Sequence, residues 1–85
     1  MRNRTRRDTA FSPVVRQRLP DELANRLLAS IAAGDFRPGD QLPPILEMAR
    51  SFRVAATTVR EALVRLEAKH VVEIRHGAGV FIVAA

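Results

Sequence analysis

The chain has 85 residues, a net charge of +5 and no cysteine. A chain this short buries only about 60% of its unfolded surface, which leaves little room for a deep catalytic pocket, and without cysteine it has no disulfides or thiolate metal sites. Its longest apolar run, residues 80–85, is far shorter than the ~20 residues that span a bilayer. We therefore expect a soluble, cytoplasmic protein that is neither an enzyme nor a membrane protein.

The positive charge is concentrated at the N-terminus. Residues 1–18 contain six arginines and a single acid, Asp8, and this segment carries the whole net charge. Residues 19–85 contain eight basic and eight acidic residues and are neutral. Because the arm has few apolar residues to bury, we expect it to be disordered in isolation. It is either a solvated leader or a basic arm that touches nucleic acid, and the folded domain is expected over residues 19–85.

The first half of this domain is predicted to be helical with one short strand. A helix is expected to start at Leu19-Pro20, where a proline and two acids suit a first turn, and to end at Gly34. A turn-rich connection over residues 35–40 and a short edge strand at Gln41-Leu42 follow. Apolar residues at helical spacing then predict a second helix over residues 45–52.

A third helix and a hairpin complete the predicted order. The third helix runs from Ala56 to about Lys69, after a tight connection at residues 53–55. β-Branched residues in 71–75 and 80–83 flank a glycine-containing tip, which is typical of a β-hairpin. The expected fold is α+β, a winged helix-turn-helix of three helices with a small antiparallel sheet and a C-terminal hairpin wing.

Two short helices joined by a tight turn predict a helix-turn-helix, and the pattern of the third helix indicates how it binds. An apolar stripe that includes Leu63 and Leu66 packs this helix against the others. Thr57, Thr58 and Arg60 fall off the stripe, so they project from the first two turns into a DNA major groove about 12 Å wide. Hydroxyls, an arginine and the amides at a helix N-terminus suit phosphate and base contacts.

The hairpin tip supplies a second predicted contact surface. Arg75 and His76 precede the tip glycines, and a tip this small can lie along a minor groove or a phosphate ridge. Arg50, Arg53 and Arg65 are weaker candidates, each either an ordinary surface charge or a phosphate contact. Two isolated histidines without cysteine make no metal set, so neither a metal nor a cofactor is expected.

Three stretches carry a resemblance to a known family. Residues 33–43 (AGDFRPGDQLP), 54–66 (VAATTVREALVRL) and 72–82 (VEIRHGAGVFI) resemble the DNA-binding domain of the GntR family of bacterial transcriptional regulators, in the subgroup typified by the fatty-acid regulator. The resemblance covers about residues 19–84.

The resemblance implies DNA contacts by Thr57, Thr58 and Arg60 from the recognition helix and by His76 and Gly77 at the wing tip. It also implies a homodimer on a palindromic double-stranded operator. Because the chain ends just after the wing, with no effector domain, we expect it to be weakly dimeric or monomeric when free and to be a fragment or a stand-alone head.

This sequence departs from the family pattern at five positions. The pattern usually has an arginine at Leu46, a Ser or Thr cap at Ala55, an arginine at Ala56, and glycine at Arg53 and His70. The family's contacts at positions 46, 55 and 56 therefore do not carry over. Two functions remain open: sequence-specific duplex binding as the N-terminal head of a regulator, or a winged-helix module that binds protein. The sequence does not indicate the operator, the effector, or activation against repression.

Overall fold

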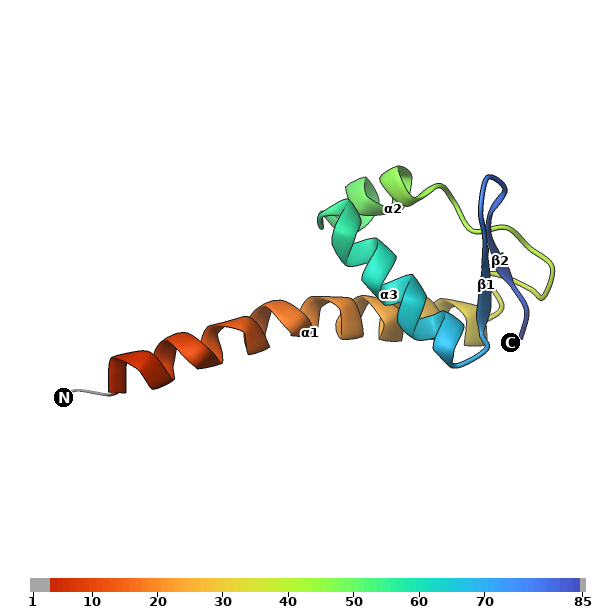
Figure 1. Ribbon diagram of the computed structural model, residues 1–85. Helices are drawn as coiled ribbons and strands as arrows, with labels where there is room; N and C mark the ends of the chain where they lie inside the picture. The colour runs from red at the N-terminus through yellow and green to blue at the C-terminus, as the bar shows by residue number, and fades with distance from the viewer. Residues whose placement is uncertain (1–3, 85) are drawn as a thin grey trace.

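The computed structural model describes the backbone of residues 4–84 and the side chains of residues 18–84. Three helices precede a two-stranded hairpin (Figure 1). The elements are α1 (Arg4–Ala32), α2 (Ile45–Phe52), α3 (Ala56–Ala68), β1 (Val72–Arg75) and β2 (Gly79–Ile82). This is a winged helix-turn-helix, so the predicted α+β fold is confirmed.

Helix α1 is longer than the sequence predicts. It begins at Arg4 and runs for 29 residues, through Pro20, to Ala32. The expected start at Leu19-Pro20 is therefore wrong, and residues 4–18, expected as a disordered arm, are helical in the structure. A proline inside a helix removes a hydrogen bond and costs about 3 kcal/mol. The side chain of Pro20 is fully buried, so its ring adds apolar area to the core at the point where the helix loses that bond.

Residues 1–3 lie outside the described residues, and contact between the N-terminal segment and nucleic acid stays a prediction. Despite its length, α1 has no apolar stretch sufficient to cross a bilayer, and neither has any other helix in the described part of the chain.

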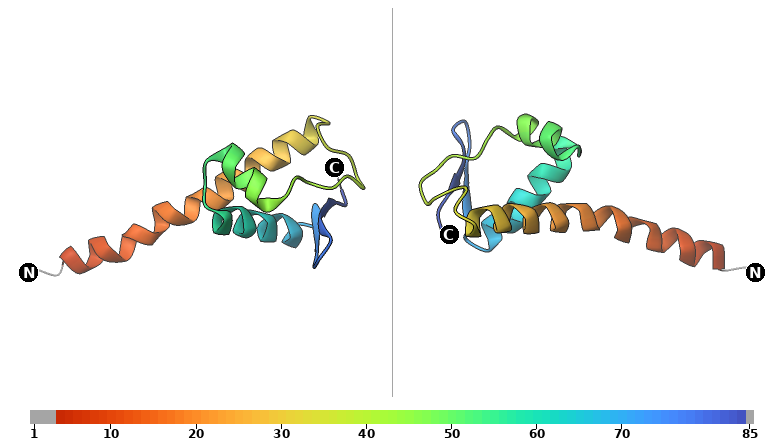
Figure 2. Two further views of the ribbon diagram at one scale, coloured as in Figure 1. Left: turned by 90° about the horizontal axis from the view of Figure 1, so that it is seen from above. Right: turned by 180° about the vertical axis from the view of Figure 1, so that it is seen from behind.

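The core forms where α3 crosses α1, as the views in Figures 1 and 2 agree. The predicted stripe of α3 is fully buried, and its members recur every three or four residues, as a one-sided helix requires. They are Val59, Ala62, Leu63 and Leu66. Helix α1 faces them with Leu23, Ala24, Leu27 and Ile31, and α2 adds Met48 and Ala49.

The hairpin is antiparallel, with Val72 opposite Ile82 and Arg75 opposite Gly79. The predicted edge strand is also confirmed, as a bridge between Gln41 and Phe81 on the other side of β2. The Leu42 amide donates to the Val80 carbonyl at 2.8 Å, and the Ile82 amide donates to the Asp40 carbonyl at 2.8 Å. The connection between α1 and α2 is thereby tied to the wing.

Both helices of the helix-turn-helix end in a left-handed residue. Arg53, with φ of 58°, follows α2, and His70, with φ of 63°, lies just beyond α3; these are the only non-glycine residues with positive φ in the described chain. After Arg53 the Val54 amide donates back to the Ala49 carbonyl at 3.0 Å, which closes the end of α2. At both positions this chain departs from the glycine of the family pattern. A positive φ favours glycine, so the backbone conformation explains the family's preference.

Candidate nucleic-acid interface

The first turn of α3 presents polar groups to solvent. Thr57 and Arg60 are exposed and Thr58 is half-buried. Ala55 occupies the N-cap position and makes no side-chain hydrogen bond, so no side chain caps this helix end. Ala56 is partly buried and packs against the core. The start of α3 therefore combines hydroxyls, a guanidinium and the positive end of a helix dipole.

No acidic residue lies one helical turn from Arg60, and the neighbouring Glu61 makes no ion pair with it in the described part of the chain. Residues three and four positions away are helix neighbours, and for Arg60 these are Ala56, Thr57, Leu63 and Val64. Among residues 18–84, neither an ion pair nor a side-chain hydrogen bond involves Arg60. Within residues 18–84 its charge is therefore unpaired.

The wing tip exposes His76 and Gly77 between the two strands. The Ala78 amide donates to the Arg75 carbonyl at 3.1 Å, which closes the turn. Gly77 has φ of 77°, a conformation that a residue with a Cβ adopts only with strain. The tip is consequently narrow, with the imidazole of His76 as its prominent polar group.

Arg60 and His76 meet at one groove. The groove lies between α3 and the hairpin and has a volume of about 510 Å³. Its wall consists of Ile45, Arg60, Leu63, Val64, Glu67, Ile74, His76 and Val80. In Figure 1 the wing tip and the α2 end of α3 lie on the upper side of the molecule, away from α1. The structure thus brings together the recognition helix and the wing residues that the sequence singled out.

Arg50 and Arg53 lie farther along the same part of the fold. Arg50 is in the last turn of α2, Arg53 forms the turn, and both side chains are exposed. Neither takes part in an ion pair among residues 18–84. Both stay predictions as phosphate contacts.

Arg65 and Arg75 already have partners within the chain. The Arg65 Nε atom lies 2.6 Å from Asp21 Oδ1 of α1, and Arg65 also donates to the Glu61 carbonyl at 3.1 Å. Arg75 lies 2.8 Å from Glu73 Oε1, and its guanidinium carbon is 4.3 Å from the centre of the Phe81 ring. Part of the donor capacity of each guanidinium is already used within the chain, which makes both weaker DNA candidates than Arg60.

Sequence reasoning missed two residues that hold the wing. Glu67 of α3 accepts the Ile74 amide at 3.0 Å, and Gln41 donates from Nε2 to the Ala78 carbonyl at 2.9 Å. Both contacts join elements that are separate in the sequence, so no local pattern marks them. The pairing of a predicted edge strand at Gln41 with the hairpin was the one available signal.

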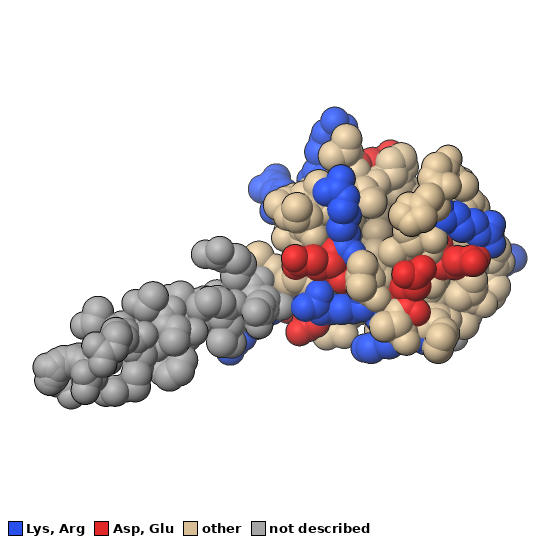
Figure 3. All heavy atoms as spheres, in the orientation of Figure 1, with Lys and Arg blue, Asp and Glu red and all other residues tan. Residues whose placement is uncertain are grey.

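Basic and acidic side chains are unevenly spread over the described surface. In the view of Figure 3, most acidic groups lie across the middle of the folded part, and basic groups lie both above and below them.

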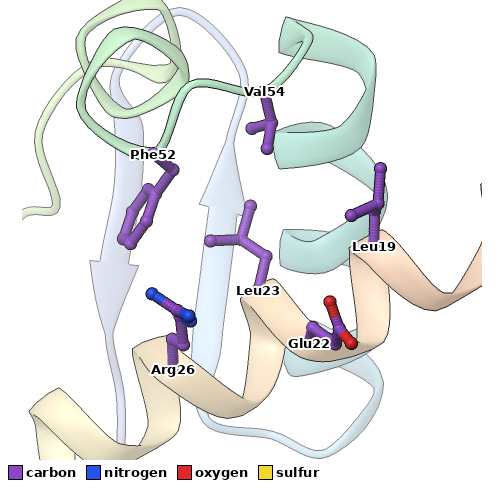
Figure 4. A pocket seen from close by; sticks show the side chains of 6 residues that line it. All are labelled: Leu19, Glu22, Leu23, Arg26, Phe52 and Val54. Atoms are coloured by element: carbon purple, nitrogen blue, oxygen red, sulfur yellow. The ribbon is translucent and has the colours of Figure 1, made fainter.

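A smaller hollow of about 160 Å³ lies between α1 and the end of α2. Leu19, Glu22, Leu23 and Arg26 line it from α1, and Phe52 and Val54 from the other side. Figure 4 shows Leu23 pointing up between Phe52 and Val54, so the hollow is a gap in the packing that joins α1 to the helix-turn-helix. None of the predicted contact residues lines it.

The sequence of residues 19–82 matches the family model described as bacterial regulatory proteins, gntR family. The chain belongs to the GntR family. The match includes α2, α3, the hairpin and every residue of these elements predicted to contact DNA.

Relatives of this GntR-family chain are transcriptional regulators. It is 37% identical over 71 residues to an uncharacterized HTH-type transcriptional regulator of Mycobacterium tuberculosis, which covers 84% of this chain and 29% of the relative. It is 41% identical over 66 residues to the Uxu operon transcriptional regulator of Escherichia coli, which covers 78% of this chain and 26% of the relative. The chain thus spans less than a third of these relatives' length.

Solved structures share the fold. Streptococcus agalactiae GntR superimposes with a TM-score of 0.69 at 33% identity, over 75% of this chain and 31% of that one. The DNA-binding domain of AraR in complex with operator ORX1 superimposes with a TM-score of 0.73 at 22% identity, over 75% of this chain and 77% of that one. The second likeness shows the fold alone.

Proposed function

We propose that this chain binds double-stranded DNA sequence-specifically as the N-terminal head of a GntR-type transcriptional regulator, and that it acts by binding without catalysis. The observation that carries the proposal is the groove that Arg60 of α3 and His76 of the wing line together. Helix and wing are thereby arranged to meet one duplex at the same time.

The dimensions and chemistry of α3 fit a major groove. A helix with its side chains is about 10–12 Å across, and the major groove is about 12 Å wide. With the start of α3 inserted, we expect Arg60 to donate two hydrogen bonds to a guanine, and Thr57 and Thr58 to donate to phosphate. The exposed tip at His76 and Gly77 then follows the adjacent minor groove.

Operator binding by a neighbour supports this arrangement. The AraR DNA-binding domain, which shares the fold, was solved with its operator bound. Winged-helix heads of this kind read half-sites, so we propose a palindromic operator bound by a homodimer, with one head in each half. This chain spans 29% of the length of the Mycobacterium tuberculosis relative. We therefore propose that the main dimer contacts of such regulators lie outside the matched head. We expect the free head to associate only weakly in the cytoplasm.

Duplex binding measured after selection from a random DNA pool tests the proposal. Arg60→Ala should weaken binding to the selected operator by about 1–3 kcal/mol and relax the preference at one base pair. Arg26→Ala is the matched control, because Arg26 is an exposed arginine on α1, outside the groove. Equal affinities of wild type and Arg60→Ala, with unchanged circular dichroism, would contradict the proposed docking of α3.

A protein-binding role is the second candidate, and exposed apolar side chains favour it. Leu46 on α2 is 61% exposed and Val64 on α3 is 57% exposed. Exposed apolar surface of this kind suits a protein partner as well as the methyl groups of thymine. Absence of duplex binding even at low salt would favour the protein partner, whereas binding that weakens steeply with salt supports DNA.

A further inference from the structure

Gln41 connects the start of the helix-turn-helix to the tip of the wing. Its Nε2 atom donates to the Ala78 carbonyl at 2.9 Å, across 37 positions of sequence. Ala78 directly follows Gly77 in the turn, so this bond ends at the part of the hairpin proposed to meet DNA. The backbone of Gln41 is meanwhile bridged to Phe81 of β2, which fixes the origin of the side chain.

Gly79 makes room for this side chain. A Cβ atom at position 79 would collide with the terminal amide of Gln41 where it now lies, so a larger residue there would require this side chain to move. Gly79 also has φ of 125°, which a residue with a Cβ rarely adopts. The position of the Gln41 side chain therefore depends on the glycine at position 79.

Besides the backbone hydrogen bonds between β2 and residues 39–42, two side chains hold the wing at separate points. Glu67 accepts the Ile74 amide at 3.0 Å and attaches β1 to α3. Gln41 attaches the tip to the connection between α1 and α2. The other hydrogen bond of the turn, from the Ala78 amide to the Arg75 carbonyl, lies within the hairpin itself. A two-stranded hairpin is at best marginally stable alone, so its orientation depends on such external attachments.

From these contacts we infer that Gln41 is a positioning residue of the wing. Its side-chain amide holds the wing tip in the orientation in which His76 and Gly77 reach the minor groove of bound DNA. The inference rests on the proposed DNA-binding function. Gln41 acts through the backbone of Ala78, and the gain for DNA binding is a tip ordered before the duplex arrives.

Backbone relaxation measurements on the free protein test the attachment without DNA. Gln41→Met keeps the length of the side chain and removes the donor. The order parameters of Gly77, Ala78 and Gly79 should fall from about 0.85, typical of rigid backbone, toward about 0.6. Arg37→Met, in the same connection, is the matched control and should leave them unchanged. Unchanged order parameters in Gln41→Met would overturn the inference, whether or not the protein binds DNA.

Operator affinity then tests the consequence for DNA. Gln41→Met should weaken binding about two- to fivefold, the net effect of one exposed hydrogen bond. The loss should disappear in a His76→Ala background, because the tip contact is already gone, and persist in an Arg60→Ala background. Equal losses in both backgrounds would indicate general destabilisation and overturn the inference. A more mobile tip in a protein that binds no duplex would instead refute the proposed function and leave the attachment standing.

Discussion

The two faces of α3 differ in what they contribute. On the inner face, Val59, Leu63 and Leu66 have no exposed surface, and they pack against α1 and the hairpin. On the outer face, Arg60 is exposed without an ion pair in the described chain and Val64 is 57% exposed. The stability of the fold depends on the inner face, so residues of the outer face can be substituted with little effect on stability. A surface can therefore be changed for binding while the fold is retained, which is how one fold serves many operators.

Leu63→Ala and Val64→Ala test this comparison most directly, because the two residues are adjacent in the sequence, yet Leu63 is fully buried and Val64 is exposed. Leu63→Ala should lower the free energy of unfolding by about 2–5 kcal/mol through a cavity in the core. Val64→Ala, at an exposed site, should change it by less than about 0.5 kcal/mol. Urea unfolding measures both. Similar losses for the two variants would show that α3 is packed differently from the structure.

The N-cap of α3 offers a smaller effect of the opposite sign. Ala55 makes no side-chain bond to the first turn. In Ala55→Ser the hydroxyl can accept an amide hydrogen bond, so we expect a gain of about 1 kcal/mol in the free energy of unfolding. Ala55→Val, which adds carbon without an acceptor, is the control and should bring no such gain. Thermal melting that ranks the valine variant equal to the serine variant would contradict the uncapped end.

Arg53, in the turn after α2, tests whether a residue outside α3 can favour DNA binding at the expense of stability. Arg53→Gly relieves a strained φ of 58°, and we expect a gain of about 0.5–1 kcal/mol, the relief less the entropy that glycine adds to the unfolded chain. If the Arg53 side chain touches phosphate, the same variant binds the operator more weakly.

His70→Gly is the matched control for this substitution, because His70 also has a positive φ, 63°, beyond the other end of α3. It should stabilise the fold without weakening binding. Equal changes of affinity in the two glycine variants would remove Arg53 from the interface.

The sequence predicted the elements that depend on local pattern. The expected helix at 45–52 coincides with α2, and the third helix and both strands agree with the structure within one or two residues at each end. The start of α1 was missed because Leu19-Pro20 has the local features of a helix start, whereas its place inside α1 depends on burial of Pro20 by other elements. Local signals cannot report such a tertiary effect.

The candidate site was predictable to a similar extent. Helical spacing was enough to place Thr57 and Arg60 off the buried stripe. It could not show that Arg65 is paired, because the partner of Arg65 lies on α1, far away in sequence. The contacts of Gln41 and Glu67 were missed for the same reason: they depend on how the hairpin folds back.

Arg60 and Arg65 allow the two sides of α3 to be compared with the same type of residue. Five positions on a helix turn a side chain by about 140°, so the two arginines of α3 point to different neighbours. Arg60 lines the groove beside the wing, and Arg65 pairs with Asp21. Because the side chains of Arg65 and Asp21 are 37% and 66% exposed, a double-mutant cycle on unfolding with Arg65→Ala and Asp21→Asn should give a coupling of only about 0–1 kcal/mol.

The salt dependence of operator binding separates the roles of these two arginines. Each phosphate contact contributes about 0.9 to the slope of log affinity against log salt. Arg65→Ala should leave this slope unchanged, since its guanidinium is directed to α1, and Asp21→Asn should not steepen it. A slope reduced by about 0.9 in Arg65→Ala would mean that Arg65 exchanges Asp21 for phosphate when DNA binds. The paired side of α3 would then belong to the interface as well, and the division between its faces would hold only for the free protein.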